Sequence, residues 1–295
     1  MLGVAGFVVV YFAILPRLGQ PGEPRDFASI AGDAERGKYL IAAAGCIACH
    51  TDFKKKGRFL AGGPALKTPF GTFYAPNITP HKQHGIGGWT LQQFSRALTA
   101  GISPKGEHYF PSFPYTSYTG MTSQDIADLK SYLDTVEPVA KQSRAHEVSW
   151  PFSDRRFVGG WKQIYFTRAA FEARTDRSAG WNRGAYLVNV LGHCGECHTQ
   201  RDLLGGHIGD RHAGNSRGPN GSKVPRIKDL RTNSGEHWKK DELTMALQVG
   251  MKPSGDFMGD AMAEVVELST SNLKTADRVA MAEYLISLAR IMHQR

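Results

Sequence analysis

The chain has 295 residues, of which 41% are hydrophobic and 21% are charged, with 33 glycines and 15 prolines. This composition is typical of a soluble globular protein with many turns, and the length suits about two domains. The formal net charge is +9. The Lys and Arg residues are scattered, however, and no nucleic-acid-reading motif accompanies them, so we expect no nucleic-acid partner.

The chain begins with an apolar segment that carries no charged residue before Arg17. A bilayer span needs about 20 apolar residues, so this segment is short for one even when Leu18 extends it. A secretory signal begins with basic residues and ends with small residues at a cleavage site, and neither feature is clear here. We interpret residues 1–18 as an uncleaved membrane anchor, with a cleaved signal as the alternative. Residues 19–29 follow as a tether that contains Gly and Pro.

A five-residue motif, C-x-x-C-H, occurs twice and contains all four cysteines of the chain. The copies are Cys46, Cys49 and His50 in the first half and Cys194, Cys197 and His198 in the second. In this motif the two thiols form thioether bonds to the vinyl groups of a haem, and the histidine is the proximal iron ligand. A redox dithiol or half of a zinc site can also use C-x-x-C, but neither requires the histidine. We therefore predict two covalently attached haem c groups, with His50 and His198 bound to iron.

The two motifs lie in two copies of one domain plan. The segment Arg-Gly-x-Tyr-Leu precedes each motif. Matched residues then recur at an offset of about 149 positions. They include Pro76 with Pro225, Trp89 with Trp238, and Gly101 with Gly250. Helices are expected at residues 90–100 and 240–249, and each copy closes with a helix, at 122–136 and 275–292. This order is that of the class I cytochrome c fold.

The fold class that we predict is all-α, with two tandem class I cytochrome c domains behind an N-terminal transmembrane anchor. The domains are residues 30–137 and 182–295. The segment between them, residues 138–181, is rich in aromatic residues and Arg, unlike a flexible Gly/Ser linker. We expect it to pack against both domains or against a partner subunit.

The second axial ligand of each iron is predicted to be a methionine, because His/Met ligation is usual for electron-carrying c-type haems. In the first domain, Met121 is the one methionine after the haem motif. In the second domain we choose Met262, whose counterpart Phe113 precedes a proline where many c-type cytochromes carry Met-Pro. The alternatives are Met258 in the second domain and His108, His81 or His84 in the first.

Several segments resemble the cytochrome c subunits of membrane-bound periplasmic dehydrogenases, namely residues 62–66, 68–80, 85–89, 110–118 and 181–187. Those subunits serve quinoprotein alcohol dehydrogenases, flavoprotein sugar and sugar-acid dehydrogenases, and molybdenum aldehyde or N-heterocycle oxidoreductases. The resemblance implies a membrane-tethered dihaem cytochrome on the periplasmic side of the bacterial cytoplasmic membrane. It would relay single electrons from a catalytic dehydrogenase subunit to a respiratory acceptor, and it would not be an enzyme by itself.

Two other functions stay open at this point. One is a free-standing or oxidase-linked dihaem carrier without a dehydrogenase partner. The other is a haem enzyme, such as a thiosulfate dehydrogenase, which would need an open or unusual axial site. A haem whose two axial positions are both filled by protein side chains cannot bind a substrate, so the axial ligands distinguish a carrier from an enzyme.

Overall fold

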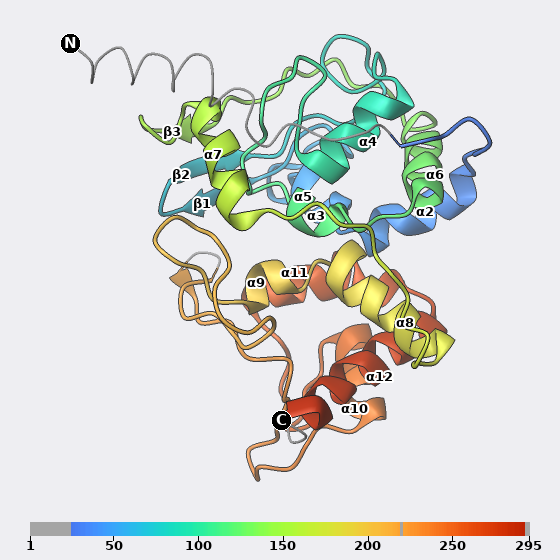
Figure 1. The fold of residues 1–295 in the computed structure, drawn as a ribbon, viewed down its shortest axis with the longest axis vertical. Coiled ribbons are helices and arrows are strands. Elements are labelled where there is room, and N and C mark those ends of the chain that lie inside the picture. The colour runs from blue at the N-terminus through green and yellow to red at the C-terminus, as the bar shows by residue number, and fades with distance from the viewer. Residues whose placement is uncertain (1–24, 219–220, 293–295) are drawn as a thin grey trace.

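The computed structural model describes residues 25–218 and 221–292. The chain folds as two halves, the first in the upper part of Figure 1 and the second in the lower part. The first half contains α2 (Ala34–Ala43), α3 (Cys46–His50), η3 (Phe53–Lys55), β1 (Ala65–Thr68), β2 (Gly71–Tyr74), α4 (Leu91–Ala100), α5 (Tyr115–Tyr118), α6 (Ser123–Leu133), β3 (Glu147–Val148) and α7 (Arg155–Tyr165). The second half contains α8 (Ala179–Tyr186), η4 (Leu187–Leu191), α9 (Gly195–His198), α10 (Lys240–Val249), α11 (Asp260–Leu268), η6 (Thr270–Asn272) and α12 (Thr275–Met292).

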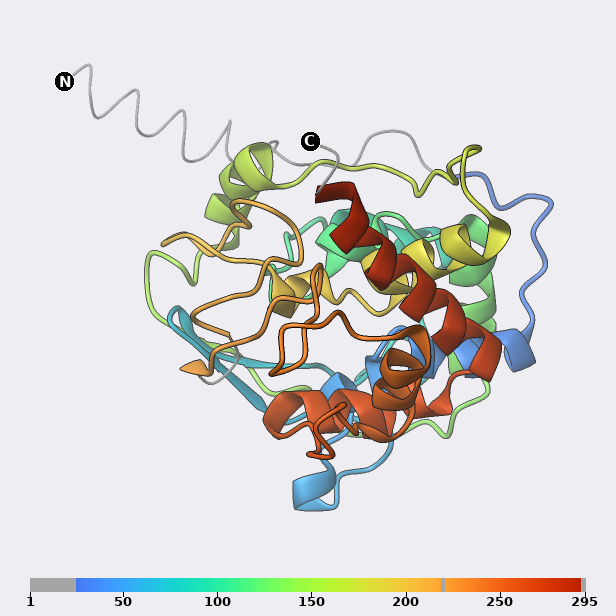
Figure 2. The same cartoon turned by 90° about the horizontal axis from the view of Figure 1, so that it is seen from below.

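In each half an early helix crosses a late one, and a glycine lies at the crossing. α2 packs against α6, and α8 packs against α12, the long helix that runs across the face shown in Figure 2. A Cβ atom on Gly37 would lie 2.0 Å from the carbonyl oxygen of Asp128, and one on Gly184 would lie 1.9 Å from that of Ala280. The repeated Arg-Gly-x-Tyr-Leu segment therefore needs its glycine because two backbones meet there. The same kind of close helix crossing is thus present in both halves.

The side chain of Asp128 fixes the first of these crossings. α2 begins after Asp33, whose carboxylate accepts the backbone N–H of Arg36 at 2.9 Å. Asp128, in the middle of α6, accepts the N–H of Asp33 at 2.8 Å and the Nε–H of Arg36 at 2.6 Å. One buried carboxylate thus holds the start of α2 against α6.

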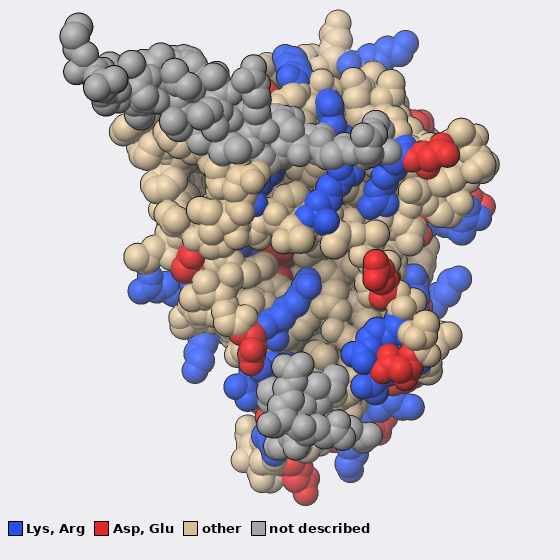
Figure 3. Space-filling view, viewed as in Figure 1, with Lys and Arg blue, Asp and Glu red and all other residues tan. Residues whose placement is uncertain are grey.

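The buried apolar side chains of the two halves form one continuous core. Its members from the first half include Leu40, Ile41, Tyr118, Met121, Ile126 and Leu129, and those from the second half include Tyr186, Leu187, Val190, Leu191, Met281 and Leu285. The two domains therefore fold against each other and share the apolar surface that they remove from water. Outside this core the surface charge is mixed, with basic and acidic side chains interspersed over the face shown in Figure 3.

The prediction of an all-α fold is wrong, because the first half contains a three-stranded antiparallel sheet with strand order β1-β2-β3. Thr68 pairs with Gly71 across a two-residue turn, and Gly71 also pairs with Val148 of β3. A Cβ atom on Gly71 would lie 2.3 Å from the carbonyl oxygen of Glu147, so glycine is needed where β3 joins. β3 comes from the segment between the domains, and this long-range pairing leaves no local sequence pattern.

The predicted transmembrane anchor is also corrected. Among the helices of residues 25–218 and 221–292, none is both long enough and apolar enough to cross a membrane. The longest, α12, carries Asp277, Arg278 and Glu283, and charged side chains are unfavourable in a bilayer core. The segment expected to form the anchor, residues 1–18, lies outside the described residues, and the fold that is observed is that of two cytochrome-like domains.

The segment between the domains packs within the chain. α7 buries Lys162, whose Nζ donates to the carbonyl oxygens of Ala100 at 2.6 Å and Gly101 at 2.9 Å at the end of α4. Burial lowers the pKa of Lys162 to about 7. At the neighbouring position of α7, the indole Nε1 of Trp161 donates to the carbonyl oxygen of Leu204 in the second half at 3.0 Å. The segment therefore contacts both domains, as expected from its aromatic composition.

The helix crossings generate a stability prediction. Gly37→Ala should lower the free energy of unfolding by about 1–3 kcal/mol, because its methyl group would meet a backbone carbonyl that cannot move aside. Gly180→Ala is the matched control in α8, since its Cβ would meet the flexible carboxylate of Glu283 at 3.3 Å. The control should be neutral or stabilising by up to about 1 kcal/mol through helix propensity. Thermal unfolding followed by circular dichroism measures both, and equal effects would show that the crossing is not tight.

Candidate haem-binding sites

The first C-x-x-C-H motif forms α3, a short helix that follows directly on α2. Gly45 separates the two helices in the left-handed conformation, with φ at 63°. Cys46 and Cys49 are three residues apart on α3, so their side chains lie on the same side of the helix. At its end, the Nδ1 atom of His50 lies 2.7 Å from the carbonyl oxygen of Pro76. The motif therefore presents two thiols and an oriented imidazole together.

The second motif repeats this arrangement with the matched residues of the second copy. Cys194 precedes α9, and His198 ends it. The Nδ1 atom of His198 lies 2.7 Å from the carbonyl oxygen of Pro225. Because a carbonyl oxygen can accept but not donate, Nδ1 carries the proton in both imidazoles. Each Nε2 atom is then left with the lone pair that a metal ion requires.

The cysteines do not gather into one zinc site. Burial raises the pKa of Cys46 and of Cys194 to about 12 and that of Cys197 to about 11. Over the described ranges, no three or more His, Cys, Asp and Glu side chains gather where they could hold a metal ion. The two C-x-x-C pairs therefore do not combine into one zinc site.

The surroundings of the second motif fit a haem group. Trp238 packs against the shared core together with Ile227 and Leu230. Its indole Nε1 is buried, and it has no hydrogen-bond partner among the residues that the structure describes. A buried N–H without an acceptor is unfavourable unless a ligand supplies one. A haem propionate is a suitable acceptor, so the donor set here agrees with the cofactor that the motif predicts.

The two methionines predicted as axial ligands occupy different environments. Met121 follows α5 and is 1% exposed, and its backbone is held by a hydrogen bond from Arg25 to its carbonyl oxygen at 2.6 Å. Met262 is half-buried near the start of α11, a helix that packs against α3. Met121 thus lies in the core beside the first domain's helices. The role of Met262 at the second haem stays a prediction, as does that of the half-buried alternative Met258.

The histidines considered for the first domain are engaged with other side chains. The ring of His81 stacks on that of His84 with the centroids 5.1 Å apart. His108 is buried, and its Nδ1 lies 3.1 Å from Nζ of Lys162. These contacts do not decide the axial ligand of the first haem, so Met121 stays a prediction, as do the alternatives His108, His81 and His84.

Known proteins resemble the chain over most of its length. Residues 34–137 match the family described as Cytochrome c. A protein named "Diheme cytochrome c-type" from Cereibacter sphaeroides is 41% identical over 266 residues, which cover 89% of this chain and 88% of that protein. The chain belongs to the cytochrome c family.

Two further relatives are much longer than this cytochrome. One subunit of the nicotinate dehydrogenase of Pseudomonas putida is 39% identical over 86% of this chain, which spans 21% of that protein. The fructose dehydrogenase cytochrome subunit of Gluconobacter japonicus is 38% identical over 91% of this chain, which spans 55% of that protein. The family membership makes this cytochrome a haem c protein that transfers electrons.

A carboxylate inside the second haem motif ties the two domains of the cytochrome together. Glu196 accepts hydrogen bonds from Thr116 at 2.6 Å and Ser117 at 2.8 Å, both on α5 of the first domain. It also pairs with Arg201 at 2.6 Å and lies 3.5 Å from His207. Burial alone would raise the pKa of Glu196, but His207, Arg201 and the two hydroxyls lower it to about 2. The second motif is therefore anchored to the segment that leads to Met121.

A second polar contact crosses the interface at the helix pairs. Asp277 of α12 accepts from Arg183 of α8, Nη2 to Oδ2 at 2.7 Å and Nε to Oδ1 at 3.0 Å. The phenol of Tyr39, on α2, donates to the same carboxylate at 2.5 Å. Burial would raise the pKa of Asp277, but the hydrogen bonds from Arg183 and Tyr39 hold it below its usual value. Tyr39 and Arg183 both belong to Arg-Gly-x-Tyr-Leu segments, so the repeat also carries interface contacts.

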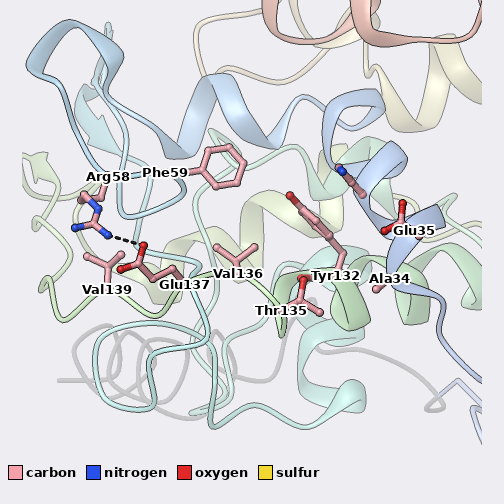
Figure 4. A pocket seen from close by; sticks show the side chains of 10 residues that line it. Ala34, Glu35, Arg58, Phe59, Tyr132, Thr135, Val136, Glu137 and Val139 are labelled. Atoms are coloured by element: carbon pink, nitrogen blue, oxygen red, sulfur yellow. Dashed lines mark hydrogen bonds and ion pairs between the residues drawn. The ribbon is translucent and has the colours of Figure 1, made fainter.

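A cavity of about 560 Å³ is lined by residues of the first domain. Figure 4 shows Tyr132 and Phe59 facing it and the pair Arg58 to Glu137, 2.6 Å apart, at one side. None of its lining residues belongs to a C-x-x-C-H motif, and none has a buried polar atom without a partner in the described part of the chain. We therefore do not identify it as a haem or ligand site.

Sequence reasoning missed the residues that join the two motifs. Glu196 occupies the place that Ala48 has in the first motif. The sequence did offer one signal, because this position of the motif holds a charged residue in the second copy and alanine in the first. Its partners Thr116 and Ser117 lie 80 and 79 positions away in the chain, and nothing in their own sequence marks them.

The Asp277 contact predicts a pH-dependent stability difference. Asp277→Asn should lower the free energy of unfolding at pH 7 by about 1–2 kcal/mol, the scale of a partly screened hydrogen bond to a charged group. Because the folded pKa lies below the unfolded value of about 3.9, the carboxylate's contribution is present above that pH and is lost as the pH falls through the folded pKa. Urea unfolding of wild type and variant at pH 7 and pH 3 measures this.

The wild-type advantage should shrink at pH 3. Asp176→Asn is the control, because Asp176 also pairs with an arginine, Arg174 at 2.7 Å, but is 58% exposed. It should change stability little at either pH. An Asp277 effect that is independent of pH would show that packing, and not charge, accounts for the contact.

Proposed function

We propose that the cytochrome holds two haem c groups, one bound covalently through Cys46 and Cys49 and one through Cys194 and Cys197. The observation that carries this proposal is the matched pair of 2.7 Å contacts, His50 Nδ1 to Pro76 and His198 Nδ1 to Pro225. A duplicated motif with a duplicated orienting hydrogen bond indicates the same ligand in both places. The relative of similar length, named as a diheme cytochrome, agrees with two groups.

The residues around each group hold and insulate it. The histidine Nδ1–H bonds fix the ring planes and the tautomer, so that Nε2 is the atom offered to iron. Met121 and Met262 are the residues that would provide the second protein ligand to each iron, and a haem held by two protein ligands would have no place for a substrate. When bound, each haem supplies a reversible one-electron couple at its iron. The residues of the chain would bind and orient each haem group and partly shield it from water.

In this proposal the cytochrome takes electrons from a catalytic dehydrogenase subunit and passes them to a respiratory acceptor, on the periplasmic side of the bacterial cytoplasmic membrane. Relatives named as cytochrome subunits of fructose, quinone-dependent alcohol and gluconate dehydrogenases, at 33–38% identity, support such a partner. The family resemblance implies a partner of the quinoprotein, flavoprotein or molybdenum class.

A free-standing dihaem carrier is the second candidate. One observation favours it. The Cereibacter sphaeroides relative, of which this chain covers 88%, has a name that mentions no dehydrogenase. The longer relatives are covered to 21–62% and are the ones named as dehydrogenase subunits. The two candidates share the haem chemistry and differ only in whether a catalytic subunit binds.

Covalent attachment predicts the haem stoichiometry. Because thioether bonds survive unfolding, acid-acetone extraction should leave two haems per chain, measured as the pyridine complex against protein concentration. Cys197→Ser should weaken attachment of the second haem and leave the first in place, and Cys49→Ser is the matched variant for the first. Loss of both haems from the wild type on extraction would contradict the proposed sites.

The partner is tested by purifying the tagged cytochrome in mild detergent from its native host. If a dehydrogenase subunit binds, it should copurify, and addition of its substrate should reduce the haems within the preparation. Ethanol, fructose, gluconate and nicotinate are the substrates to try first, since the relatives' names include these classes. A preparation that contains the cytochrome alone, and whose haems none of these substrates reduces, would favour the free-standing carrier.

A further inference from the structure

The second haem motif carries one more residue than the first. Cys46 follows Tyr39 by seven positions, whereas Cys194 follows the matching Tyr186 by eight. The first copy reads Gly45-Cys46 at this point, and the second reads Gly192-His193-Cys194. The extra residue is therefore His193, directly before the first thiol of the second motif.

The helix before the second motif accommodates this insertion. In the first half, α2 continues as an α-helix to Ala43. In the second half, α8 is followed by a π-helical turn, η4, from Leu187 to Leu191. The N–H of Gly192 bonds to the carbonyl oxygen of Leu187 at 2.7 Å. A single π-turn is the way in which a helix absorbs one added residue, and such turns occur frequently at functional sites. His193 itself has a positive φ of 39°, a conformation more accessible to histidine than to most residues.

The inserted imidazole lies between the two haem motifs. Its ring meets that of Tyr118 edge to face, with the centroids 5.5 Å apart. Its Nε2 would lie 3.3 Å from a Cβ placed on Gly45, and the backbone of the preceding residue, Ala44, is within reach of the ring. Tyr118 donates its hydroxyl hydrogen to the same Ala44 carbonyl oxygen. Ala44 and Gly45 immediately precede Cys46, so His193 connects the turn before one haem motif with the turn before the other.

Neighbouring contacts also hold the two motifs close together. Glu196, on the other side of Cys194, is bonded to Thr116 and Ser117 directly before Tyr118. The haem-motif helix α3 also packs near the second half, through contacts with α11. The two motifs are therefore neighbours in space, and the residues on both sides of Cys194 hold them together.

We propose that His193 is a positioning residue, inserted into the second motif to fix the separation and orientation of the two haem groups through Ala44 and Tyr118. This inference rests on the proposed function, in which both motifs hold haem. Electron transfer between the two requires no other reactant, because the electron lost by one iron, from ferrous to ferric, is the electron gained by the other. The rate of this transfer falls steeply as the distance between the two irons grows. Fixed contacts between the domains at His193, Ala44 and Tyr118, which we call the junction, therefore favour direct transfer.

The test measures the junction in the intact two-haem protein. His193→Gly removes the imidazole without straining the left-handed backbone. Pulsed electron paramagnetic resonance of the oxidised protein reports the magnetic coupling between the two irons, and flash reduction reports the rate of electron exchange between them. In His193→Gly the distribution of iron-to-iron distances should broaden and the exchange rate should fall several-fold.

Two further variants make the outcome specific. Lys56→Gly is the matched control, because Lys56 is exposed and also has a positive φ, of 51°, so it tests added backbone freedom alone. It should match the wild type. His193→Gln should restore much of the wild-type behaviour, since its amide can donate to the Ala44 carbonyl. If His193→Gln shows the same broad distance distribution and slow exchange as His193→Gly, a hydrogen bond to Ala44 is not the contact that fixes the haem groups.

Failure of this proposal is separable from failure of the proposed function. Haem content per chain is measured on each variant first, so a protein with fewer than two haems contradicts the haem sites and not the junction. If His193→Gly retains two haems and shows wild-type coupling and wild-type exchange, His193 does not position the haems.

Discussion

The haem sites depend on one hydrogen bond, made twice, from an imidazole Nδ1 to a proline carbonyl. This bond decides which nitrogen of His50 and His198 faces the cofactor. The carbonyl must itself be held, and in the first domain Asn77 does this directly after Pro76. The side-chain amide of Asn77 donates to Val139 at 2.8 Å and Lys141 at 3.0 Å. The segment between the domains therefore supports the proposed first haem ligand, His50, although it lies far from the motif in sequence.

The two copies of the domain differ most clearly where they face each other. Glu196 stands where the first motif has Ala48, and His193 has no counterpart at all. Both residues contact α5 or the turn between α2 and α3 in the first domain. The repeated residue Tyr39 also contacts the other half, at Asp277, so the copies are joined both by repeated positions and by positions at which they differ. The shared plan supplies the proposed haem sites, and the differences add contacts between the copies.

The junction also explains why one core serves both domains. Polar groups buried at an interface are favourable only when they are paired, and Glu196 has four partners within the cytochrome. With these pairs formed, apolar side chains such as Tyr186, Leu187 and Val190 can pack directly on the first domain's helices. An arrangement of this kind suits the proposed transfer of electrons between two haem groups.

The haem motifs, the repeated plan and the principal helices could be predicted from the sequence. Each of these depends on the spacing of residues that are close together in the chain. C-x-x-C-H needs five adjacent residues, and the helix ends at Gly101 and Gly250 follow from left-handed caps at φ of 62° and 76°. The tertiary structure decided the sheet, the packing of α7 and the contacts of Glu196 and His193. These depend on pairs of residues tens of positions apart, and the free energy of such a pair is set by burial and geometry that only the folded chain provides.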